Sequence, residues 1–220
     1  MIDRYDWPGG HEALWRFGPD TGPVVVMLLP PFEEANRTRT FAVGLLRALA
    51  VRGIASVLPD LPGQGESLLP TDAATLADWR AAVTALVAAI DRPVVGAAIR
   101  AGALFDSEAD LAGRWHLAPQ SGAALVRELG RIAGRIDRNA TCIDIAGNRI
   151  APALLDELAP AIPSDAHPRR VVRLGTDPKD ADLRIDAAPL WRRAEPGDDP
   201  ALAELLADDL GAWSRACVGW

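Results

Sequence analysis

Lysine is almost absent from this chain: its 220 residues contain one, Lys179, so nearly all of the positive charge is carried by arginine. The guanidinium group favours planar, bidentate pairing with carboxylates. Acidic residues outnumber basic ones, and the formal net charge is −7. A nucleic-acid partner needs a basic surface to meet its phosphates. The charge balance therefore argues against a nucleic-acid partner.

Cysteine is also scarce, and long apolar runs are missing. Cys142 and Cys217 lie far apart with no metal-ligand spacing around them, which predicts free thiols in a reducing compartment, no metal site and no cofactor. Apolar runs such as residues 81–90 are too short to span a bilayer, and the N-terminus lacks the basic head and apolar core of a signal peptide. We therefore expect a soluble, cytoplasmic protein without membrane insertion. Its oligomeric state is left open.

Apolar residues make up 49 % of the chain, which is enough for a full hydrophobic core. Apolar runs alternate with helical patterns, and Gly or Pro separates them. This predicts one α/β domain over residues 1–220, with a mostly parallel central sheet flanked by helices. Strands are expected at Glu12–Phe17, Val24–Leu29, Ile54–Leu58, Val94–Ala97, Arg114–Leu117, Val171–Leu174 and Leu183–Ile185, with a short one within 142–147. Helices are expected at residues 41–51, 76–90 (capped by Thr71 or Asp72), 121–135, 151–161 and 201–217.

The stretch from Arg92 to Leu104 organises the rest of the chain. A short apolar run is followed by a tight turn and an Ala-rich helical segment, which is the layout of the nucleophile elbow in α/β-hydrolases. Small residues must flank the nucleophile there; here they are Ala98 and Gly102, and Arg100 stands between them. Arginine cannot attack a carbonyl, because its guanidinium stays protonated and offers no lone pair. The frame of a hydrolase is present without its nucleophile.

Three further segments extend this pattern. They are Pro30–Arg39 (PPFEEANRTR), the Asp60–Ser67 loop with its Asp-x-x-Gly-x-Gly-x-Ser pattern, and Leu117–Gly122 (LAPQSG). Together with residues 98–104 they resemble the α/β-hydrolase-like proteins found with exosortase A systems, the second of two such families. The resemblance runs from about residue 24 to 215. It implies a bacterial α/β-hydrolase-like protein linked to exopolysaccharide export and PEP-CTERM protein sorting. The elbow position of that family is also commonly arginine, although this chain is shorter and its lead into the elbow differs.

A serine hydrolase needs a nucleophile, a histidine base and an acid that orients the base. The base belongs in the loop after the last strand, and residues 186–197 contain no histidine. Asp177 lies where the resemblance places the acid, but without a histidine it is equally a turn-forming aspartate. Ser121 is an alternative nucleophile, with His116 or His167 as its base, although a helix N-cap role also explains it. We single out no confident catalytic residue.

Arg100 is expected at the carboxyl edge of the sheet, where open α/β folds bind ligands. Its side chain should enter a groove bounded by Pro31, Phe32, Gln120 and Ser121, in which Phe32 supplies the oxyanion amide because proline has no N–H. If Glu33 or Glu34 pairs with Arg100, the charge is satisfied and the pocket favours neutral ligands. If both glutamates face solvent, water or an anion such as a carboxylate or phosphate must satisfy the guanidinium. We expect the second arrangement.

Two classes of function follow. The first is a degenerate, non-catalytic hydrolase that binds a small ligand, expected to be anionic, through Arg100 and its neighbours. The alternative is an active hydrolase or acyltransferase that acts on an ester-type substrate through unconventional groups. A surface that binds a protein partner, with no small ligand, is a third possibility. The missing nucleophile and the missing histidine favour the first.

Overall fold

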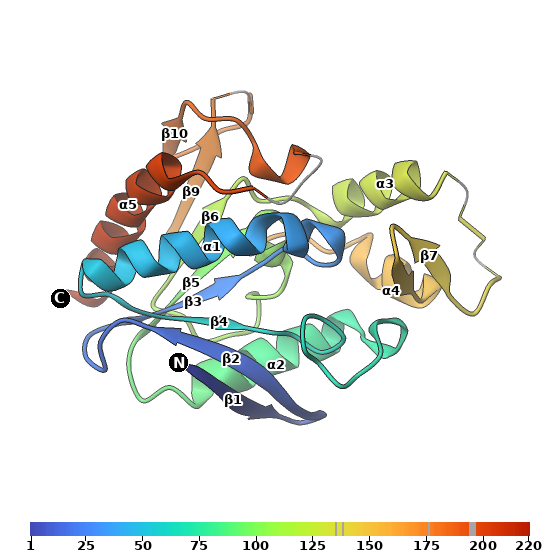
Figure 1. The fold of residues 1–220 in the computed structure, drawn as a ribbon, viewed down its shortest axis with the longest axis horizontal. Helices are drawn as coiled ribbons and strands as arrows, with labels where there is room; N and C mark the ends of the chain where they lie inside the picture. Colours follow the sequence, from blue (N-terminus) through green and yellow to red (C-terminus); the bar gives the residue numbers. More distant parts are fainter. Residues whose placement is uncertain (135, 138, 176, 194–196) are drawn as a thin grey trace.

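An eight-stranded sheet forms the centre of the computed structural model, which describes residues 1–134, 136–137, 139–175, 177–193 and 197–220. The strand order is β1-β2-β4-β3-β5-β6-β9-β10, with β1 at one edge and β10 at the other (Figure 1). The first two strands pair antiparallel to their neighbours, and the remaining pairs are parallel. The strands are β1 (Ile2–Trp7), β2 (Gly10–Phe17), β3 (Val24–Leu28), β4 (Ala55–Pro59), β5 (Val94–Ile99), β6 (Gly113–Leu117), β9 (Arg169–Leu174) and β10 (Leu183–Ile185).

Helices cover both faces of this sheet. The face on which Met27 lies packs against α1 (Glu33–Val51) and α5 (Pro200–Val218), which run side by side (Figure 1). Val26 and Leu28 point to the other face, where α2 (Leu76–Ala88) lies. This alternation follows from the two-residue period of a strand, and it explains why both faces of β3 are apolar. Further helices are α3 (Gly122–Ala133), α4 (Pro152–Leu158) and the short 3₁₀ turns η1 (Thr71–Ala73), η2 (Arg100–Leu104) and η3 (Leu190–Arg192).

The mostly parallel sheet flanked by helices is confirmed, with strand ends within a few residues of the predicted ones. The first strand, β1, was not predicted, because its residues at the sheet edge are mostly exposed and include three charged side chains, so that they do not form an apolar run. The segment at 142–147 is a two-stranded hairpin of β7 (Ile143–Ile145) and β8 (Asn148–Ile150), separate from the main sheet. Residue 135, at the predicted end of the helix at 121–135, lies outside the described residues.

Two helix starts differ from prediction. Helix α1 begins at Glu33 rather than residue 41, because its polar first two turns hide the apolar spacing. The cap of α2 is Thr75 rather than Thr71 or Asp72: the Thr75 hydroxyl accepts from the Asp78 amide, and the Asp78 carboxylate accepts from the Thr75 amide. That reciprocal pair satisfies two helix-end donors. Among the described residues, no helix is long and apolar enough to cross a membrane.

Candidate functional site

The elbow turn is present after β5, with arginine at its centre. Arg100 has a φ of 56°, a left-handed conformation that is unusual for a residue with a side chain. Gly102 meets the end of β3 so closely that an added Cβ would lie 2.4 Å from the Leu28 carbonyl oxygen. These two features confirm the predicted turn and its need for a small residue. The segment that follows is the five-residue 3₁₀ turn η2 rather than a full helix.

The guanidinium of Arg100 is held by two carboxylates and a ring. Its Nε donates to Glu34 Oε1 at 2.8 Å, and its Nη2 donates to Glu128 Oε2 at 3.1 Å. The Trp191 ring lies against the same group, with 5.1 Å from the Arg100 Cζ to the ring centroid. Gln120 Nε2 donates to the same Glu128 oxygen at 2.8 Å. We call Arg100, Glu34, Glu128, Gln120 and Trp191 the elbow cluster.

The elbow cluster changes the expected electrostatics of the groove. The Arg100 side chain is 16 % exposed and the Glu34 side chain 12 %, so the bond between them is largely screened from water. The prediction that both neighbouring glutamates would face solvent is therefore wrong for Glu34: α1 begins earlier than predicted, and its first turn brings this carboxylate to the elbow. Burial raises the pKa of Glu34 above its ordinary value, against the lowering effect of the Arg100 charge. An anion at this guanidinium would have to compete with two carboxylates already in place.

Trp191 occupies the region in which a hydrolase keeps its histidine. It lies in η3, a few residues after β10, and packs on Arg100. The elbow and the loop after the last strand therefore meet as they do in a Ser–His pair, but with Arg100 and Trp191 as the partners. A cation on an indole face is attractive. Neither group can take a proton from a substrate or attack one at neutral pH.

The oxyanion position is also engaged. Phe32, with a φ of 63°, precedes the first turn of α1, and its amide donates to Gln64 Oε1 at 3.2 Å. This is the amide that the sequence assigned to an oxyanion hole. Gln64 belongs to the Asp60–Ser67 loop. A side chain of this hydrolase-like loop therefore accepts the hydrogen bond of the Phe32 amide, which in a hydrolase would be donated to the oxyanion.

Asp177 and Ser121, the other candidate catalytic residues, make no contact with the Arg100 guanidinium and are engaged elsewhere. Asp177 Oδ2 accepts from Arg173 Nη1 at 2.5 Å, and Asp177 Oδ1 accepts from the Lys179 amide. Burial alone would raise the pKa of Asp177, but these hydrogen bonds and the Arg173 charge together hold it below its ordinary value. Ser121 is the N-cap of α3, where its side chain accepts from the Ala124 amide, as its position before the helix predicted.

The histidines do not complete a catalytic pair with Ser121. His116 is fully buried on β6, and its Nε2 lies 2.8 Å from Asp106 Oδ2. His11 and His167 are exposed, and neither makes a side-chain hydrogen bond within the described part of the chain. Both cysteines are free and half-buried, as predicted. The described residues contain no cluster of metal-ligating side chains.

The Asp60–Ser67 loop is fixed by its own side chains. The buried Asp60 carboxylate accepts from Arg39 Nη2 at 2.7 Å and from the Glu66 amide at 3.1 Å. Ser67 Oγ accepts from the Gly63 amide and donates to Glu12 Oε1. The pattern that suggested a hydrolase loop therefore has a structural role in this protein.

A small cavity of about 40 Å³ lies beside the elbow cluster, between the start of α1, α3 and η3. Such a space holds about one water molecule, since one water occupies ~30 Å³ in the liquid. Among the described residues, Arg100, Gln120 and Ser121 do not line it. The side chains that do are mostly apolar, with charged groups from α1 and α3: Pro31, Phe32, Glu33, Glu34, Arg37, Leu125, Glu128, Leu129, Ile132 and Trp191.

Sequence reasoning found Arg100, Phe32, Glu34 and Gln120, but it missed three residues that define the site. Gln64 stood inside a segment of the resemblance and Trp191 in the loop after the last strand, yet nothing in their spacing indicated what they contact. Glu128 carried no signal, since an acidic residue on an amphipathic helix is ordinarily a solvated one. The common signal is positional: each lies on a segment that the topology of this sheet brings to the carboxyl ends of its strands.

No family model matches this chain, and no curated protein matches it. Solved structures do. The structure of Est1E from Butyrivibrio proteoclasticus with bound ferulic acid matches with a TM-score of 0.66 at 16 % identity, over 99 % of this chain and 100 % of that one. The α/β-hydrolase domain-containing protein 10 from mouse has a TM-score of 0.65 at 15 % identity and covers 97 % and 98 %. The chain therefore has the α/β-hydrolase fold.

Similarity at this level of identity establishes the fold and does not carry the activity of these proteins to this chain. The chain spans 39 % of the length of an epoxide hydrolase from Vigna radiata, VrEH1, with a TM-score of 0.44. That partial match supports no argument here.

Proposed function

We propose that this chain is a non-catalytic protein built on the α/β-hydrolase fold. The observation that carries the proposal is the elbow cluster: the position of the nucleophile holds an arginine whose charge Glu34 and Glu128 already satisfy. Trp191 stands where a base is needed, and the Phe32 amide is engaged by Gln64. The nucleophile and the base are each replaced by another residue, and the oxyanion donor already has a hydrogen-bond acceptor. Removing triad members from a working hydrolase costs several orders of magnitude in rate.

The same contacts bear on the ligand. Because the guanidinium is paired, the site favours a neutral ligand with an apolar group over a free anion, which revises the anionic preference drawn from sequence. The cavity of about 40 Å³ is too small for an ester substrate. A ligand must therefore enter between α1 and α3 and displace part of the wall formed by Ile132, whose side chain is half-exposed.

The biological setting rests on the resemblance of Pro30–Arg39 and the three other segments to exosortase A-associated proteins. We place the chain, as part of this proposal, in the bacterial cytoplasm beside exopolysaccharide export and PEP-CTERM protein sorting, as a binding protein. Activity on an ester would assign it instead to the hydrolases or acyltransferases of that setting.

Labelling with a fluorophosphonate probe tests the proposal, together with release of nitrophenol from short-chain nitrophenyl esters. We expect no labelling above a heat-denatured sample and no ester turnover above buffer, while a serine esterase in the same tube reacts fully. Ser121→Ala serves as the matched variant. Stoichiometric labelling that disappears in Ser121→Ala would overturn the proposal and make Ser121 the nucleophile; labelling that persists would overturn it through another serine.

A further inference from the structure

A second, larger cavity lies at the opposite end of the sheet from Arg100. It has a volume of about 530 Å³, is open to solvent, and is lined by α2, the start of β5 and the segment before β6. Val94 begins β5 and Arg100 follows its end, and six strand residues span ~20 Å. Small-molecule sites in proteins occupy about 300–1,000 Å³. The cavity is therefore of ligand size and separate from the elbow cluster.

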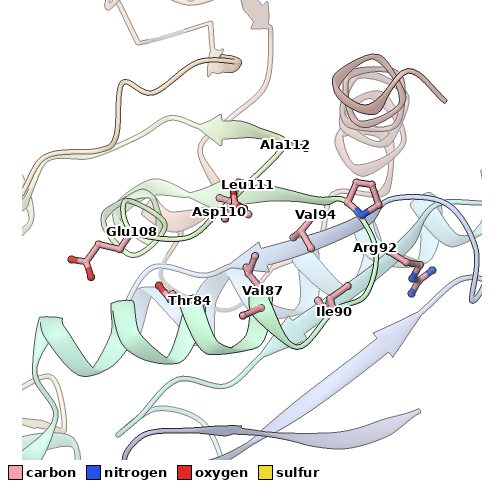
Figure 2. Close-up of a pocket in the computed structure, with 11 residues that line it drawn as sticks. Thr84, Val87, Ile90, Arg92, Val94, Glu108, Asp110, Leu111 and Ala112 are labelled. Atoms are coloured by element: carbon pink, nitrogen blue, oxygen red, sulfur yellow. The ribbon is translucent and has the colours of Figure 1, made fainter.

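The middle of this cavity is apolar. Figure 2 shows Val87 of α2 and Ile90, just after this helix, on one side and Leu111 on the other, with Val94 of β5 between them. Val87 and Val94 are buried, whereas Ile90 and Leu111 are half-buried. An aliphatic chain laid between these walls would be removed from water, which is favourable by about 25 cal/mol for each Å² of apolar surface.

Opposite charges line the same cavity without neutralising each other. Asp110 is exposed and makes no hydrogen bond or ion pair with any described residue. Arg92 has one long hydrogen bond, 3.5 Å from Nη1 to the Gly22 carbonyl, and pairs with no carboxylate in the described part of the chain. Glu108, at the end away from Arg92 (Figure 2), is 3.4 Å from Arg80, which offsets its charge, so Asp110 is the carboxylate of this lining that has no cation partner among the described residues. The cavity thus has an acidic end, an apolar middle and a basic end.

We infer that this cavity binds a small zwitterion with an aliphatic body. The ammonium group pairs with Asp110 near Glu108, the carboxylate pairs with Arg92, and the aliphatic chain lies between α2 and Leu111. A simple carboxylic acid would form the ion pair with Arg92 but leave Asp110 without a partner. A simple amine would pair with Asp110 and leave Arg92 without one. Selectivity for a molecule with both charges is the signature of the site. The inference does not depend on the function proposed for the elbow cluster.

Isothermal titration with aminohexanoate and aminooctanoate, against octanoate and octylamine, tests it. We expect the better amino acid to bind at least about threefold more tightly than either single-charge compound, since an exposed ion pair contributes up to ~1 kcal/mol. Asp110→Asn and Arg92→Gln should each weaken that binding by a similar factor. Arg47→Gln and Asp180→Asn, exposed and outside the cavity, serve as matched controls and should bind as the unaltered protein does.

Three results would overturn the inference. One is that neither amino acid binds up to its solubility limit. Another is that octanoate or octylamine binds as tightly as the amino acids, which would show that at most one of the two charged groups of the ligand contributes to binding. The last is that Asp110→Asn and Arg92→Gln bind no more weakly than the two controls. Circular dichroism of each variant establishes that the fold is kept. Asp110 is exposed, and Arg92 is half-buried with one long hydrogen bond, so no loss of folding is expected.

Discussion

The pair between Glu34 and Arg100 offers the sharpest test of the elbow cluster, because its two partners can be removed singly and together. Both side chains are mostly buried, at 12 % and 16 % exposure. Removing one partner of a buried pair costs about 3–5 kcal/mol. Arg100 retains Glu128 and Trp191 when Glu34 is replaced, so we expect Glu34→Gln to lower the free energy of unfolding by about half of that, ~2 kcal/mol. For a chain of this length, 2 kcal/mol corresponds to a fall in Tm of about 4–8 °C.

Two properties of the pair pull in opposite directions, and a double-mutant cycle separates them. The short bond favours the ionised pair, whereas the raised pKa of Glu34 shows that its burial outweighs the attraction of Arg100. The cycle of Glu34→Gln, Arg100→Gln and the double variant measures the coupling alone. Urea unfolding at pH 7, followed by tryptophan fluorescence, gives each free energy. We expect a coupling of about 1–3 kcal/mol.

The matched control is the exposed pair of Arg16 and Asp3, whose side chains are 41 % and 44 % exposed. A cycle of Arg16→Gln and Asp3→Asn should give a coupling of about 0–1 kcal/mol. If the Glu34–Arg100 coupling is no larger than this, the guanidinium is not held by Glu34. The elbow cluster would then be open to an added anion, and the anionic ligand expected from sequence would regain its basis.

The remaining predictions concern pH and backbone contact. Burial raises the pKa of Glu12, so the folded carboxyl binds its proton more tightly than the unfolded one, and this stabilisation is lost as pH rises above about 4.5 through the folded pKa. Urea midpoints should therefore fall for the unaltered protein relative to Glu12→Gln between pH 5 and pH 8; a constant difference would show that Glu12 does not carry the dependence. Gly102→Ala should destabilise the fold by about 2 kcal/mol or more because its Cβ would meet the Leu28 carbonyl. Gly44→Ala, in α1, should stabilise by ~0.5–1 kcal/mol, because the nearest atom to its Cβ would be Asp198 Oδ1 at an ordinary contact distance of 3.6 Å. Thermal unfolding of both variants checks this pair, and equal shifts would show that the elbow relaxes without cost.

The sheet and its two helical layers could be predicted from sequence because buried parallel strands have continuous apolar sequences with Gly or Pro at their ends. Val94–Ile99 and Ala55–Pro59 are of this kind, and both faces of each are covered. The edge strand β1 was not predictable in the same way, since one partner strand and solvent impose no apolar run on it. Helix α1 was recognised only from its apolar half, because Glu33 to Thr40 pack through a few buried positions such as Ala35 and Thr38.

The sequence predicts the site residues whose position is set by local backbone geometry. It does not predict those that join the site through contacts between distant segments. The positions of Arg100 and Gly102 follow from the geometry of a tight turn after a strand, and the small residues on either side of Arg100 indicate this turn in the sequence. The partners of Arg100 come from α1, α3 and η3, which are far apart in sequence, and no local pattern states that Glu128 or Trp191 meets it. The expectation that Arg100 is unpaired was wrong for that reason. It considered only Glu33 and Glu34 as partners, and it placed them in a solvated loop, whereas they form the first turn of α1.

The conformation of Arg100 bears on why such a turn persists without a nucleophile. A non-glycine residue in the left-handed region costs of order 1–3 kcal/mol, which surrounding contacts must offset. In a hydrolase that conformation presents the nucleophile to substrate. Here it directs the guanidinium to carboxylates on two helices and to an aromatic ring on a third segment, so that one side chain joins α1, α3 and η3 at the end of the sheet. The contacts of Arg100 therefore offset the cost of its backbone conformation and hold these three segments together.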